Sequence, residues 1–172
     1  MNSSDTASKA AHKLSVRRIV EIAILSEKPK RYALIAYVIA IVPVLILGLL
    51  LNWIGIESHH SETKTVGQKW LFIVASLAVA PVIETFLMIP VFGLLRLVAN
   101  NKGWLCFGSA LIWATIHSSF DWRWGITVFW LFVVYSFSYL TWEKRSRNFA
   151  VAITASIHAL VNTIPALVIV FG

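Results

Sequence analysis

The sequence predicts an all-α protein built from membrane-spanning helices, and three observations support this fold class. Of the 172 residues, 58% are hydrophobic and 13% are charged, whereas soluble domains have about 45–50% apolar and about 25% charged residues. The mean hydropathy is +0.76. Five apolar windows also approach or exceed the roughly 20 residues needed to cross a bilayer core. This composition excludes a soluble enzyme, and the windows predict spans at 32–56, 70–98, 104–120, 125–142 and 149–171.

The chain is expected to form one integral membrane domain, residues 1–172, with a cytoplasmic segment, residues 1–31, ahead of the first span. Residues 9–25 mix basic and apolar side chains, which predicts an amphipathic helix lying on the membrane surface. The first span begins too late and is too long for a cleaved signal peptide. The single cysteine, Cys106, excludes an intrachain disulfide and a cysteine-based structural zinc site.

The basic residues are divided unequally between the two sides of the predicted membrane domain. Seven precede the first span, two join the second and third spans, and three join the fourth and fifth, so twelve share one side. The opposite side has only Lys64, Lys69 and Arg123. The positive-inside rule therefore predicts a cytoplasmic N-terminus and an external C-terminus. The net charge of +7 is explained by topology, which points to membrane lipids as partners and away from nucleic acid.

Four polar residues interrupt the predicted spans: Glu84 in the second, His117 in the third, and His158 with Asn162 in the fifth. Ionisable residues inside a membrane are costly, by about 2.5–3.5 kcal/mol for Asp at a helix centre, and usually mark functional sites. Counted from the cytoplasmic end at about 1.5 Å per residue, the four lie at depths of roughly 21, 20, 14 and 20 Å. Residues four apart share a helix face. These depths allow the four side chains to share a layer near mid-membrane.

This set of side chains has the chemistry needed to activate a water molecule. Glu84 is the predicted general base, which deprotonates a water held between it and His117. The water attacks a peptide carbonyl, and His158 with Asn162 donate hydrogen bonds to the developing oxyanion. Pro81 precedes the glutamate by three residues, and it leaves carbonyl groups without a backbone donor.

In order and spacing, these residues resemble three motifs of the CPBP intramembrane proteases, also called the Abi or CAAX-protease-like family. The family shows a proline-led Glu-Glu-x-x-x-Arg, then an aromatic-x-x-x-His, then His-x-x-x-Asn, each on a membrane helix. The matching positions are Pro81 with Glu84, Trp113 with His117, and His158 with Asn162. The resemblance covers about residues 70–166. It implies a multi-pass peptide-bond hydrolase of a prokaryotic plasma membrane, acting in or near the bilayer without a cofactor. Family substrates include prenylated C-terminal tails, peptide or bacteriocin leaders and C-terminal sorting signals.

Two departures from the family pattern keep a second interpretation open. Thr85 replaces the second glutamate of the first motif, and Ile89 replaces its arginine. A catalytically inactive membrane immunity or interaction protein of the same fold is the alternative, in which Glu84 and the histidines only hold helices together. A proton-linked transporter would need a continuous polar path, and only the central layer is polar.

A metal site is a further alternative for the same residues. Glu84, His117 and His158 formally make a His₂Glu zinc set, although no His-Glu-x-x-His helix is present. A water-activating Glu and His pair needs no metal, so the metal-free site is preferred. Taken singly, His117 also fits an interfacial histidine, and His158 with Asn162 fit hydrogen bonds between helices. The adjacent His59 and His60 belong to the external loop and are left out of the site.

Overall fold

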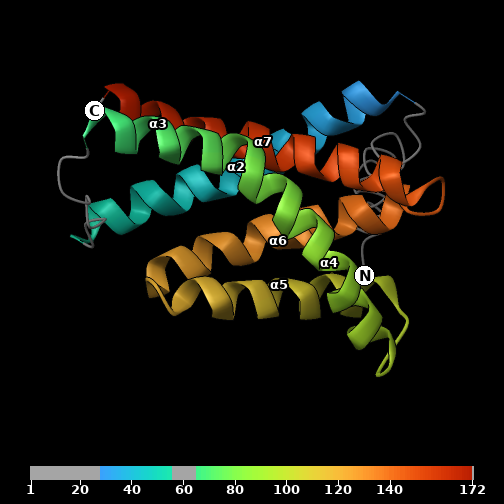
Figure 1. Cartoon of the computed structure of the whole chain (residues 1–172). Helices are drawn as coiled ribbons and strands as arrows, with labels where there is room; N and C mark the ends of the chain where they lie inside the picture. Colours follow the sequence, from blue (N-terminus) through green and yellow to red (C-terminus); the bar gives the residue numbers. More distant parts are fainter. Residues whose placement is uncertain (1–27, 56–64, 172) are drawn as a thin grey trace, which may run out of the picture.

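The structure is a computed structural model that describes residues 28–55 and 65–171. All regular structure in these residues is helical, and the helices pack as a bundle (Figure 1). The predicted all-α fold class is therefore confirmed for this part of the chain. The predicted amphipathic helix at 9–25 and the pair His59 and His60 lie outside the described residues.

Within residues 28–55 and 65–171, four helical segments are long and apolar enough to cross a membrane. The elements are α2 (Pro29–Trp53), α3 (Val66–Val74), the π-helical turn η1 (Ala75–Val79), α4 (Ala80–Arg96), α5 (Lys102–Ser118), α6 (Trp122–Trp142) and α7 (Arg147–Phe171). α3, η1 and α4 are continuous, and together they make one candidate span beside α2, α6 and α7. By length and composition the chain is thus a multi-pass membrane protein. α5 has 17 residues, or about 25 Å, which is shorter than a hydrocarbon core of about 30 Å.

The helices begin two to four residues before the predicted spans. Capping residues set the starts of α3, α5 and α6, and α2 begins at Pro29 without a side-chain cap. Thr65 and Gln68 form a capping box at the start of α3. The side-chain oxygen of Asn101 accepts from the backbone N–H of Trp104 at 2.7 Å, and that of Asp121 accepts from Arg123 at 3.0 Å. Each bond satisfies a backbone donor that the first turn leaves unpaired. The turn between α5 and α6 consequently ends at Asp121 instead of extending to Arg123.

α6 lies at the centre of the bundle and packs against α2, α5 and α7. Its Phe132, Tyr135 and Tyr139 are fully buried and lie three and four residues apart, so they form one aromatic face. Tyr139 stacks on Phe92 of α4 with ring centroids 5.3 Å apart. Aromatic packing on α6 therefore holds the helix that carries Glu84.

The two ends of the bundle differ in charge. The starts of α2, α5 and α7 lie at one end, together with the ends of α4 and α6 (Figure 1). An ion pair of 2.6 Å between Arg96 and Glu143 joins α4 to the end of α6. Within the described residues this end has eight basic side chains: Lys28, Lys30, Arg31, Arg96, Lys102, Lys144, Arg145 and Arg147. The opposite end has Lys69 and Arg123, so the charge asymmetry read from the sequence is also an asymmetry of the folded bundle.

Candidate functional site

Glu84 and His158 meet between α4 and α7. Their Oε2 and Nε2 atoms are 3.8 Å apart, with 20% of the glutamate side chain and 8% of the histidine side chain exposed. This distance is longer than a direct hydrogen bond, so the two groups are close neighbours without a hydrogen bond between them. The structure thus brings together a carboxyl group and an imidazole from two different predicted spans.

Aromatic side chains of α6 surround the histidine of this pair. The ring of Tyr135 stacks on His158 with centroids 4.5 Å apart and an interplanar angle of 24°. Phe132 meets the same imidazole edge-on at 5.9 Å. The Tyr135 hydroxyl is buried without a hydrogen-bond partner in the described part of the chain, and it is close enough to Glu84 for an electrostatic interaction. The pair therefore lies against an apolar wall that contains one unpaired hydroxyl.

His117 reaches the same wall from α5. It is buried, and its ring lies 6.0 Å from Phe132, so both histidines flank one phenylalanine. His117 Nδ1 lies 2.8 Å from the Trp113 carbonyl oxygen, which can only accept, so Nδ1 carries the proton and a neutral ring leaves Nε2 free as an acceptor. The close contact with Glu84 is made by His158, while His117 is the more distant imidazole. An edge-on contact of 4.7 Å with Trp124 also places His117 near the end of α5.

Asn162 lies on α7 and makes its hydrogen bond to the backbone of η1, in the span formed by α3, η1 and α4. Its Nδ2 donates to the carbonyl oxygen of Ser76 at 2.8 Å. The η1 turn explains this bond: the Ala80 N–H donates to Ala75 and Pro81 has no N–H, so the Ser76 carbonyl lacks a backbone donor. One N–H of Asn162 is therefore used to hold α7 against η1, and the amide retains a second.

The two departures from the family pattern leave Glu84 as the carboxylate of this site. Thr85 is fully buried, and its hydroxyl donates to the Pro81 carbonyl at 2.6 Å within its own helix. Ile89 is partly buried and packs against the apolar core. Neither residue adds a charge beside Glu84, so the chemistry rests on one carboxyl group and the two imidazoles.

The zinc set that the sequence formally allows is not assembled. Across residues 28–55 and 65–171, no three His, Cys, Asp or Glu side chains lie close enough together to hold a metal ion. Glu84 and His158 supply two donors, whereas a catalytic zinc site needs three protein ligands. The residues present therefore do not fit a zinc ion in this arrangement.

Two features of the site were not predicted from the sequence. Tyr135 was not singled out, although Phe132, Tyr135 and Tyr139 follow helical spacing on one apolar span. A tyrosine hydroxyl in such a span is a polar group that needs a partner, and this was the available signal. The second feature is the π-helical turn η1, whose Ser76 carbonyl accepts the hydrogen bond of Asn162. Pro81 is the only sign of this turn in the sequence.

Comparison with known protein families, with curated proteins and with solved structures finds no match to this chain. The pair of Glu84 and His158, with its surrounding aromatic wall, therefore carries the functional conclusion.

Exchange of Asn162 for leucine is expected to lower the free energy of unfolding by about 1–2 kcal/mol, since it leaves the Ser76 carbonyl unpaired between helices. Pro81→Ala restores a backbone N–H near that carbonyl, so Asn162→Leu should cost less in the Pro81→Ala background. Thermal or chemical unfolding in detergent of the wild type, the two single variants and the double variant measures this coupling. Additive effects of the two substitutions would show that the missing proline N–H does not explain the bond.

Proposed function

We propose that the chain is an intramembrane endopeptidase that hydrolyses a peptide bond in or near the bilayer. The observation that carries this proposal is the close approach of Glu84 to His158 inside a membrane helix bundle. The resemblance to CPBP proteases supports the same function and a prokaryotic plasma membrane. The basic end of the bundle then faces the cytoplasm, and α5 makes a short fifth crossing.

The proposed reaction begins with a water molecule bound beside Glu84. This water donates one hydrogen bond to the Glu84 carboxylate and a second to the free Nε2 of His117. Glu84 takes a proton from the water while the water oxygen bonds to the carbonyl carbon of the substrate peptide bond. The π electrons of that carbonyl group move to its oxygen, which becomes the oxyanion. His158 donates a hydrogen bond from Nε2–H to this oxyanion. When the carbon–nitrogen bond breaks, protonated Glu84 returns the proton to the departing amine. In this scheme Asn162 is a positioning residue, because its amide fixes α7 and hence His158.

New peptide ends in the membrane proteome test the proposal, and they can be detected for a substrate of any sequence. Membranes from cells expressing the wild-type chain and from cells expressing Glu84→Gln are compared by profiling new peptide N-termini. We expect termini that occur only with the wild-type chain and that map to segments in or beside membrane spans. Identical termini in the two samples, with both proteins present at equal amounts, would contradict a peptidase.

The Tyr135 hydroxyl is proposed to hold the same water or the substrate carbonyl, since it is buried, unpaired and close to Glu84. Tyr135→Phe should slow cleavage by about tenfold, the size of one hydrogen bond to a charged group. The unfolding temperature should stay the same or rise, because the substitution removes a buried group that has no partner. Loss of stability together with unchanged cleavage would instead assign the hydroxyl a structural role.

A second candidate function is a membrane immunity or interaction protein without catalysis. The bond from Asn162 to Ser76 favours it, because a residue of the third motif is engaged in holding two helices together. In such a protein Glu84→Gln preserves the biological activity, since glutamine keeps a polar side chain of the same size beside His158. Strict dependence of that activity on the Glu84 carboxylate would argue against this function.

A further inference from the structure

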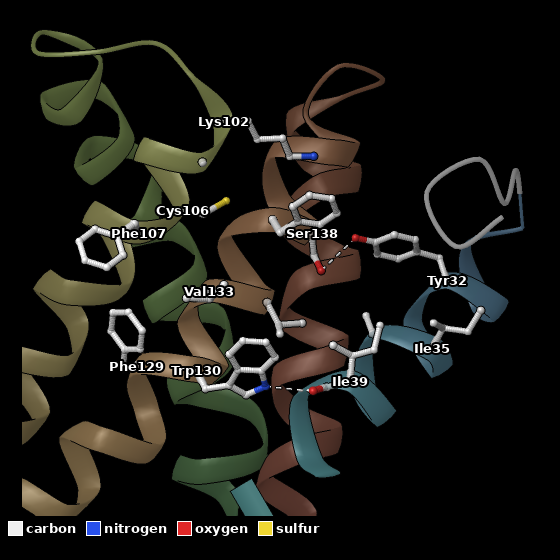
Figure 2. A pocket seen from close by; sticks show the side chains of 14 residues that line it. Tyr32, Ile35, Ile39, Lys102, Cys106, Phe107, Phe129, Trp130, Val133 and Ser138 are labelled. Atoms are coloured by element: carbon white, nitrogen blue, oxygen red, sulfur yellow. Dashed lines mark hydrogen bonds between the residues drawn. The ribbon is translucent and has the colours of Figure 1, made fainter. Parts of the chain in front are cut away.

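A groove separate from the candidate site runs along the side of the bundle between α2 and α5, with α6 as its floor (Figure 2). Its volume is about 640 Å³, within the range of about 300–1,000 Å³ typical of ligand pockets. Aliphatic and aromatic side chains form most of the lining, including Ile35, Phe107, Phe129 and Val133. None of the four candidate site residues belongs to it. The groove is therefore an apolar feature of the side of the bundle, distinct from the candidate site.

Two hydrogen bonds between α2 and α6 keep this groove open. The Tyr32 hydroxyl donates to Ser138 Oγ at 3.2 Å, and the Trp130 indole N–H donates to the Ile39 carbonyl at 3.0 Å. Figure 2 shows one bond near each end of the groove. The wall that α2 contributes is therefore tied to the α6 floor at two points by contacts within the chain.

The groove has the length of one membrane leaflet. Along α6 its lining extends from Phe129 to Ser138, or about 14 Å at 1.5 Å per residue. Half of a hydrocarbon core of about 30 Å is about 15 Å. One end lies at the basic end of the bundle and the other near the middle of the helices, so the groove follows the path of a lipid chain in that leaflet.

A lysine marks the end of the groove at the headgroup level. Lys102 Nζ donates to Thr141 Oγ1 at 2.6 Å and lies 3.6 Å from the centre of the Phe137 ring. An ammonium group has three N–H donors, so donors remain for an anion. Lys30, Arg31 and Lys144 lie at the same end of the bundle, so positive charge at this level is not confined to Lys102.

We propose that this groove binds the acyl chain of an anionic phospholipid, with the lipid phosphate at Lys102. The apolar lining suits an acyl chain, and the length of the groove equals the depth of one leaflet. Lys102 complements the negative charge of the headgroup. Residues 9–25 of the same chain are a poorer occupant, because they carry four basic residues and one acidic residue and would bring like charges to Lys102. The site lies on other helices than Glu84 and His158, so it does not depend on the proposed peptidase activity.

Lipid retention by the purified full-length protein provides the test. Native mass spectrometry in detergent is expected to show one bound phosphatidylglycerol and no comparable binding of phosphatidylcholine. Added phosphatidylglycerol should also raise the unfolding temperature, since a ligand that binds only the folded state stabilises it. Equal retention of the two lipids, or of neither, would overturn the proposal.

Two variants locate the site, each with a matched control. Lys102→Gln should weaken phosphatidylglycerol binding roughly tenfold, the size of one charge-assisted hydrogen bond, whereas Arg145→Gln removes one charge at the same end without touching the groove. Gly103→Leu should fill the entrance and abolish retention. A Cβ at Gly103 meets only Asn101 Oδ1 at 3.6 Å, and one at Gly93 on α4 meets nothing within 4 Å, so Gly93→Leu is the control. Equal effects of variant and control would contradict the assignment.

Photo-crosslinking identifies the occupant directly. Phe107 lines the groove and is half exposed, so replacement by p-benzoyl-phenylalanine places a reactive group inside it. An adduct with the mass of phosphatidylglycerol supports the proposal. A cross-link to residues 1–27 of the same chain, or to a second copy of the chain, would overturn it.

Discussion

Replacing Glu84 by glutamine is expected to slow peptide cleavage by about 10²–10⁴-fold, the usual contribution of a general base. Glutamine preserves the size of the side chain and keeps a polar group beside His158, but it cannot take a proton from water. The folded bundle should be unaffected or slightly stabilised, because a neutral amide is cheaper to bury than a carboxylate. Cleavage rates and unfolding temperatures of the purified proteins, measured together, separate the loss of chemistry from loss of folding.

Glu143→Gln is the matched control for this prediction. Glu143 has the same exposed side-chain fraction as Glu84, 20%, and its carboxylate pairs with Arg96 at the basic end of the bundle. Losing that partly buried pair should cost about 1 kcal/mol of stability and leave cleavage intact. Full activity in folded Glu84→Gln would end the hypothesis of a glutamate base.

The placement of Glu84 beside His158 also shows how far the sequence can be interpreted. Because helical rise is nearly constant at about 1.5 Å per residue, depth counting places Glu84 level with His117 and Asn162, at roughly 20 Å, and His158 about 7 Å lower. The structure instead brings His158 to Glu84. Rotation about the helix axis is harder to predict. The η1 turn ahead of α4 changes the helical phase at Ala75–Val79, so the sequence alone does not show which imidazole is nearer the carboxylate.

The positions of the helices can likewise be predicted from the sequence, whereas their first residues cannot. Apolar windows locate the helices, because lipid-facing and core-facing residues are both apolar, but the starts depend on local caps at Thr65, Asn101 and Asp121. The groove at Lys102 is less predictable still. It arises from the angle between α2 and α5 on either side of α6, and the side chains on these helices are apolar whether or not a space lies between them.

The largest expected loss of stability comes from Gly125→Ala, at about 1–3 kcal/mol, the usual cost of overpacking. Gly125 is buried near the start of α6, where the α5 and α6 backbones approach each other. A Cβ at this position would lie 2.7 Å from the Ala114 carbonyl oxygen and would also collide with the Ser118 side chain. Because one of these atoms belongs to the backbone, a rotamer change cannot relieve the contact and the helices must move apart.

Two comparisons make this prediction specific, and they connect it to the site. Gly93→Ala should be neutral or stabilising, since a Cβ there meets nothing within 4 Å and alanine favours the helix by about 0.5–1 kcal/mol. Ser118→Gly should recover only part of the loss in Gly125→Ala, because the Ala114 oxygen remains. His117 adjoins Ser118 on α5, so separating the helices also draws this imidazole away from Phe132, and cleavage should fall together with stability. An unchanged unfolding temperature in Gly125→Ala would show that α5 and α6 are farther apart than this packing requires.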